Sequence, residues 1–180
     1  SCRPLLESNE RFCDFNMRKL MGDSPLFTNF GIAQIENLID ANKLDKISEI
    51  TKSLEANGLI IHVNPLQEWA QPEGDIFRYP PVETISRVLE LIDMPVIVKE
   101  VGQGFGPKSL DALIKMPLSA IEFAAYGGTN FTILEHARLN SSNSVKTGHK
   151  AQFGNIGHTA QQMISWVNSS LLDKDAVCRE

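Results

Sequence analysis

The chain has 180 residues, which is enough for one domain. Of these residues 42% are hydrophobic, and the formal net charge is −5. This acidic balance lacks the electrostatic footprint of a nucleic-acid-binding protein, and no apolar run approaches the roughly 18 to 20 residues of a membrane span. The three cysteines have neither disulfide-framework nor zinc-ligand spacing, so we expect a reduced, cytoplasmic setting.

Strand-like and helix-like segments alternate along the chain. Short apolar runs bounded by Pro and Gly are typical of strands, and apolar stripes with a helical period are typical of helices. Such alternation predicts parallel strands joined by right-handed crossovers. The predicted elements are a strand over 25–31, a helix over 44–54, a strand over 59–61, a loop over 69–81, a helix over 83–93, a strand over 95–98, a helix over 107–115, a strand over 120–124, a helix from a Thr129 cap to 138, a loop over 139–150 and a helix over 158–172.

Three of the predicted strands end abruptly in polar or glycine-rich residues. The strand over 59–61 runs into His62-Val63-Asn64, the next into Lys99-Glu100, and the third into the glycines at 127–128. Continuous apolar strands indicate burial on both faces. Polar tips on successive strands favour a barrel over an open doubly wound sheet. A complete barrel needs about 250 residues, so we expect an α/β fold: a partial TIM (β/α)8 barrel with about four parallel strands, forming a single domain over 1–180.

The segment from His62 to Glu68 carries the densest chemistry. His62, Asn64 and Gln67 can hydrogen-bond a substrate, and Glu68 is a hard oxygen ligand suited to Mg²⁺. The alternative is that His62 and Asn64 are satisfied polar groups of the core and that Glu68 caps a turn.

Two later tips could contact a cofactor. Lys99 ends an apolar strand, so its ammonium either pairs with a carboxylate or faces a bound anion, and the second is favoured. Glu100 should point the other way, because side chains alternate along a strand. The glycines over 102–106 lack nucleotide-loop spacing and are interpreted as a turn. Residues 127–130 offer backbone amides to an anion or a flavin, and an ordinary glycine turn with a threonine cap remains open.

Several motifs together resemble one enzyme family. They are HVNPLQE at 62–68, PVIVKEVG at 95–102 and YGGTNF at 126–131, with PLFTNFG at 25–31 and the opening Ser-Cys-Arg. In this order they resemble the type 2 isopentenyl-diphosphate isomerase family, from the start of the chain to about residue 166. The resemblance implies an FMN-dependent TIM barrel that interconverts isopentenyl and dimethylallyl diphosphate, with Mg²⁺ on the diphosphate. It also implies NADPH as the reductant of the flavin.

The resemblance implies roles for individual residues. Gln67 would bind the substrate, His62 and Asn64 would line its pocket and complete the catalytic set, and Glu68 would bind Mg²⁺. The other implied contacts are Lys99 at the polar edge of the flavin ring, Ser1, Asn29 and Thr129 at flavin-contacting positions, and Ser1, Cys2 and Arg3 at positions that hold the substrate.

Departures from the family pattern also have consequences. Ala124 stands where many members carry a flavin-binding serine, and Glu122 replaces the usual aspartate. The N-terminal and C-terminal parts of the barrel have no counterpart here, so we interpret the chain as an internal piece that is inactive in isolation.

Two open strand edges predict a homo-oligomer. The substrate would be a small allylic or homoallylic diphosphate, and we expect neither a nucleic-acid nor a membrane partner. The alternatives are another FMN-dependent barrel oxidoreductase, such as an α-hydroxy-acid oxidase relative, and a non-catalytic fragment that only oligomerises.

Overall fold

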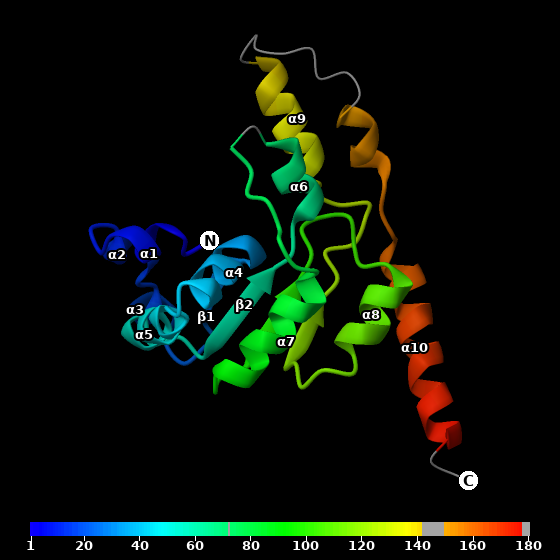
Figure 1. Ribbon diagram of the computed structural model, residues 1–180, viewed down its shortest axis with the longest axis horizontal. Coiled ribbons are helices and arrows are strands. Elements are labelled where there is room, and N and C mark those ends of the chain that lie inside the picture. Colours follow the sequence, from blue (N-terminus) through cyan, green and yellow to red (C-terminus); the bar gives the residue numbers. More distant parts are fainter. Residues whose placement is uncertain (72, 142–149, 178–180) are drawn as a thin grey trace. The chain divides into compact units, whose positions relative to one another are not determined.

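Four strands make up one sheet in the order β1-β2-β3-β4 in the computed structural model, which describes residues 1–71, 73–141 and 150–177 (Figure 1). They are β1 (Phe27–Gly31), β2 (Gly58–His62), β3 (Val96–Lys99) and β4 (Ala120–Glu122). β1 pairs with β2 in parallel, and β2 pairs with β3 in parallel. The expected fold class is confirmed: parallel strands alternate with helices, as in part of a (β/α)8 barrel.

Helices precede the first strand, connect successive strands and follow the last one. They are α1 (Pro4–Glu7), α2 (Phe12–Phe15), α3 (Arg18–Met21), α4 (Ile32–Asp40), α5 (Asp45–Ser53), α6 (Pro65–Ala70), α7 (Pro81–Leu91), α8 (Pro107–Leu113), α9 (Phe131–Ser141), the 3-10 helix η1 (Lys150–Asn155) and α10 (Ala160–Val177). Among the described residues, no helix combines the length and the apolar character needed to cross a bilayer.

Several helix starts differ from the predicted ones, and α7 begins at Pro81 rather than at 83. Asn130, rather than Thr129, caps α9, because its Oδ1 accepts the backbone N–H of Ile133 at 3.2 Å. α10 begins at Ala160 rather than at 158, after Thr159, whose Oγ1 accepts the N–H of Gln162 at 3.3 Å. Most of the loop predicted over 139–150 lies outside the described residues, and its first residues belong to α9.

The chain divides into two compact units. The first comprises residues 1–63, 77–99 and 118–120, and the second comprises 64–76, 100–117 and 121–180. The sequence-predicted site residues are shared between the two units.

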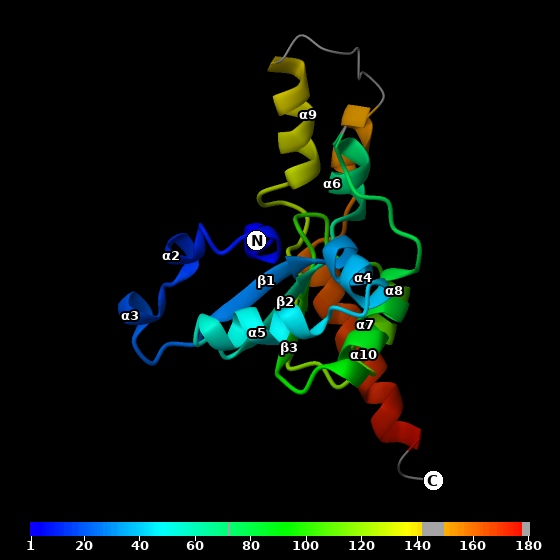
Figure 2. The ribbon, with the colours of Figure 1, turned by 60° about the vertical axis from the view of Figure 1, so that its left-hand side comes forward.

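The sheet of the first unit is fully buried on one face only. Helices α4 and α5 pack against β1 (Figure 2), and the hydroxyl oxygens of Thr28 in β1 and Thr51 in α5 lie 2.8 Å apart. The sequence predicted burial on both faces, whereas alternate strand residues are only half-buried, because the helices in contact with β1 cover the opposite side. The fully buried set is Phe30, Leu59, Ile61, Val96 and Val98, and the half-buried set is Asn29, Ile60, His62, Ile97 and Lys99.

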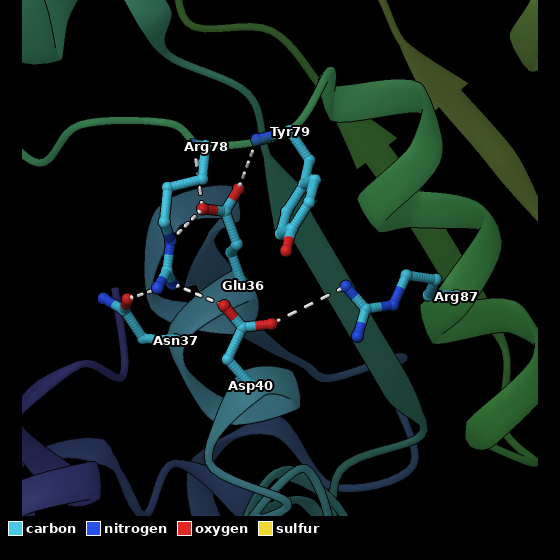
Figure 3. Close-up of polar contacts among 6 residues, drawn as sticks. All are labelled: Glu36, Asn37, Asp40, Arg78, Tyr79 and Arg87. Carbon is cyan, nitrogen blue, oxygen red and sulfur yellow. Dashed lines mark hydrogen bonds and ion pairs between the residues drawn. The ribbon is translucent and has the colours of Figure 1, made fainter.

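A buried carboxylate on α4 fixes the chain just before α7 (Figure 3). Glu36 is 2% exposed, and its Oε1 accepts both the backbone N–H and the Nε–H of Arg78 at 2.9 Å. Its Oε2 accepts the N–H of Tyr79 at 3.4 Å. The Arg78 guanidinium also lies 2.9 Å from Asp40 Oδ2, and Arg87 of α7 stacks over the Tyr79 ring at 5.6 Å. These contacts join α4 to the entry of α7 by charge-assisted hydrogen bonds.

Candidate functional site

Polar side chains of the first unit meet where β1, β2 and β3 end. His62 and Lys99 are register partners, so their side chains stand side by side on the half-buried face. The Nδ1 of His62 lies 2.6 Å from the Oδ1 of Asn29. Because an amide oxygen can only accept a hydrogen bond, this assignment places the proton on Nδ1 and leaves Nε2 as an acceptor.

The surroundings of His62 favour its neutral form. Burial lowers the pKa of His62, and the positive charge of Lys99 lowers it further, to about 4 from the ordinary 6.5. The imidazole therefore stays uncharged around neutral pH, where Nδ1–H donates to Asn29 and Nε2 can accept a hydrogen bond from a ligand.

The first residues of the chain dock on the same strand end. The backbone N–H of Cys2 donates to the carbonyl oxygen of Asn29 at 2.7 Å, and the Ser1 hydroxyl donates to that same oxygen at 3.3 Å. The N–H of Arg3 donates to the Ser1 Oγ at 3.3 Å. The structure thus brings the predicted residues at 1–3 to Asn29, which in turn contacts His62.

A second cluster lies in the second unit, where Pro65 begins α6. The Nδ2 of Asn64 donates to Glu68 Oε1 at 2.8 Å and to Gln67 Oε1 at 3.3 Å. Asn64 and Glu68 are 3% and 7% exposed. Among the described residues, the Oδ1 of Asn64 is buried without a hydrogen-bond partner. The other oxygen of Glu68, Oε2, accepts the N–H of Asp75 at 2.8 Å.

Glu135 of α9 belongs to this cluster, and sequence analysis missed it. It is 7% exposed, and its Oε1 accepts from Gln71 Nε2 at 2.6 Å and from Gln67 Nε2 at a long 3.4 Å. The Nε of Arg138 lies 3.0 Å from its Oε2. No local sequence signal pointed to Glu135, because its partners Gln67 and Gln71 lie more than sixty residues earlier.

Thr129 lies on an exposed turn of the second unit, two residues before α9. A Cβ added to the preceding Gly127 or Gly128 would meet no atom within 4 Å, so the backbone of this turn is open to a ligand. The sequence-predicted site residues therefore fall into two groups, one in each unit. The strand-end residues lie in the first unit, and Asn64, Gln67, Glu68 and Thr129 lie in the second.

Curated proteins of one name match most of the chain. It is 33% identical over 143 residues to a protein of Borrelia garinii, covering 79% of this chain and 39% of that protein. The match to a Rickettsia felis protein is 31% over 157 residues, 87% of this chain and 44% of the relative. A Nostoc protein is 34% identical over 134 residues, 74% of this chain and 37% of the relative.

All three relatives are named isopentenyl-diphosphate delta-isomerase. This chain is similar to isopentenyl-diphosphate delta-isomerases. It spans about two fifths of the length of the curated relatives that it matches. No protein-family model matches the chain.

Proposed function

We propose that this chain is part of a type 2, FMN-dependent isopentenyl-diphosphate isomerase, which interconverts isopentenyl and dimethylallyl diphosphate with Mg²⁺ bound. The observation that carries the proposal is the buried arrangement of Asn64, Gln67, Glu68 and Glu135, in which two amides connect two carboxylates. The names of the relatives support the reaction, and the strand-end motifs support the flavin-dependent type.

The side-chain oxygen atoms of Glu68 and Asn64 are of the kind that bind magnesium. The Nδ2 of Asn64 donates to Glu68 Oε1 at 2.8 Å, and the buried Oδ1 of the same amide has no hydrogen-bond partner in the described part of the chain. The described ranges contain no group of three or more His, Cys, Asp and Glu side chains placed to hold a metal. Mg²⁺ is commonly bound by one or two carboxylates together with substrate phosphate oxygens and water. Glu68 would therefore hold the ion jointly with the diphosphate.

The open turn at 127–129 suits the polar edge of a flavin. Its backbone is unobstructed at Gly127 and Gly128, and the Thr129 side chain is exposed. Within the first unit Ser1 lies beside Asn29, and the flavin contacts expected of Ser1, Asn29 and Lys99 stay predictions from the resemblance. When reduced by a donor such as NADPH, bound FMN supplies a flat, electron-rich ring that stabilises a carbocation-like centre.

Residues of this chain can bind the substrate and orient the groups around it. Allylic isomerisation adds a proton at one carbon and removes one at another. Glu135 accepts at Oε1 from the amides of Gln67 and Gln71, and this contact helps to orient the Gln67 amide toward a substrate. Asn64 donates to the Oε1 of Gln67 and so fixes which end of that amide faces Glu135. The neutral His62 orients a ligand rather than delivering a proton.

Glu68→Gln tests the magnesium assignment in the full-length product of the gene that encodes this chain. We expect Mg²⁺-dependent substrate binding to weaken about tenfold or more, because a charged ligand becomes a neutral one. Bound flavin, measured by its visible absorbance, should remain. Glu90→Gln, an exposed carboxylate on α7, is the matched control. Loss of flavin from Glu68→Gln would show that Glu68 is wrongly assigned.

The spectrum of the wild-type protein tests the proposal as a whole. A yellow protein whose absorbance changes when isopentenyl diphosphate is added supports it. A flavoprotein that instead oxidises a 2-hydroxy acid supports the alternative oxidoreductase. A colourless oligomer supports the non-catalytic alternative.

A further inference from the structure

The carboxylate of Glu100 anchors a glycine-containing loop in the second unit. Glu100 is 6% exposed. Its Oε2 accepts the backbone N–H groups of Gly102 at 2.8 Å, Gln103 at 2.6 Å and Gly104 at 2.9 Å. Hydrogen bonds to an ionised oxygen are about twice as strong as neutral ones. Three successive amides that converge on one carboxylate oxygen hold the loop as a fixed turn.

Two glycines allow this convergence and bring the loop against the Thr129 turn. Gly102 and Gly104 have φ values of +128° and +74°, which L-amino acids with side chains rarely adopt. A Cβ at Gly102 would lie 2.2 Å from the carbonyl oxygen of Thr129 and 2.8 Å from the Cα of Asn130. The anchored loop is thus in direct backbone contact with the segment that leads into α9.

Gln103 ties the same loop to the other elements of the unit. Its Nε2 donates to the carbonyl oxygens of Phe153 at 3.0 Å and Ile156 at 2.9 Å. Its Oε1 accepts from the Thr132 hydroxyl at 3.3 Å, and its backbone oxygen accepts the N–H of His158 at 2.7 Å. The place of the first turn of α9 therefore depends on a loop whose own conformation depends on Glu100.

We propose that Glu100 is a positioning residue for the flavin site, acting through the Gly102 backbone on the turn at Thr129. This inference rests on the proposed function. Glu100 itself contacts loop amides rather than the ligand. Without its charge, the three amides lose a charged acceptor and their hydrogen bonds weaken, so the loop supports the Thr129 carbonyl less firmly. The affinity for FMN then falls although every flavin-contacting side chain is retained.

The test measures FMN binding by quenching of flavin fluorescence in the full-length gene product stripped of flavin. We expect Glu100→Gln to raise the dissociation constant about tenfold, as the loss of one charge-assisted contact does, and to change the shape of the bound flavin spectrum. Glu100→Asp, which keeps the charge, should recover part of the affinity. Asp111→Asn, a partly exposed carboxylate on α8 that pairs with Lys115, is the matched control and should bind FMN as the wild type does.

Gly102→Ala provides a second, independent variant. It keeps the carboxylate of Glu100, pushes on the Thr129 carbonyl and the Asn130 Cα, and strains the loop at a φ of +128°, so it should weaken FMN binding by a similar factor. Should Glu100→Gln yield no folded protein, as judged by circular dichroism, Gly102→Ala decides alone. Unchanged FMN affinity in the folded variants overturns the positioning role while the proposed function stands. A wild-type protein that binds no FMN overturns the proposed function itself.

Discussion

His62 couples folding to pH through its unusually low pKa. Burial, and then the charge of Lys99, hold the pKa of His62 at about 4 in the folded protein, against 6.5 in an unfolded chain. Between these values the unfolded state binds more protons, so stability rises with pH across this window. The contribution is complete above pH 6.5 and is lost as the pH falls to 4, with an upper limit of about 3 kcal/mol.

Denaturant unfolding at pH 7 and pH 5 measures how much the free energy of unfolding depends on the protonation of His62. The wild type should lose stability between the two conditions, and His62→Gln should lose less. NMR titration of the imidazole gives the pKa directly, and Lys99→Met should raise it by removing a neighbouring charge. An imidazole that titrates near 6.5 in the folded protein contradicts the geometry at the end of β2.

At the scale of elements, Glu36 holds the entry of α7 on α4. Burial raises the pKa of Glu36, but hydrogen bonds from Arg78 and Tyr79 outweigh it and hold that pKa below the ordinary 4.5. The stabilisation is therefore complete above pH 4.5 and is lost as the pH falls further. We expect Glu36→Gln to cost about 1 to 3 kcal/mol at pH 7, since a buried charged acceptor with several donors is lost.

Thermal unfolding at pH 7 and pH 3 tests the role of Glu36. Its substitution by Gln should lower the melting temperature at pH 7 and have less effect at pH 3, because the stabilisation by the ionised carboxylate declines as the pH falls below 4.5. Glu90→Gln, an exposed carboxylate on α7, serves as the control. Equal effects of the two variants would mean that Glu36 contributes only as one surface charge does.

The strands were predictable from the sequence, whereas two of the helices beside them were not. Runs such as Leu59-Ile60-Ile61 predict strands, because short segments rich in β-branched apolar residues between turn signals favour buried strands. Helix α4 was missed because Ile32 follows the turn glycine directly, without a capping side chain. In α6, the polar residues after Pro65 were assigned to a strand tip, although Pro at the first helical position is itself a helix-start signal.

The residues of the candidate site also differ in how far the sequence predicts them. Those within one motif were predicted, and the one that depends on a long-range contact was not. His62, Asn64 and Glu68 stand in one contiguous motif, so chemistry alone singled them out. Glu135 gave no local signal, because its partners Gln67 and Gln71 lie more than sixty residues earlier and meet it only when α6 packs on α9.

At the scale of the whole molecule, the half-buried sheet face of the first unit predicts self-association of this 180-residue chain. Ile60 and Ile97 lie on that face, each only partly covered within the described residues. Removing apolar surface from water lowers the free energy by roughly 25 cal/mol for each square ångström. Copies of the chain that pair these faces are therefore stabilised. The edge at β4 is less able to pair, since that strand has three residues and ends in the exposed Glu122.

Sedimentation velocity over a range of concentrations tests this expectation for the 180-residue chain. The wild type should form dimers or larger species, and Ile97→Gln should shift the distribution toward monomer by removing apolar surface from the shared face. Leu91→Gln provides the control, because Leu91 is 63% exposed but ends α7 rather than lying on the sheet. If Leu91→Gln dissociates the species and Ile97→Gln does not, association occurs through the helices, and the sheet face is not the surface that copies of the chain share.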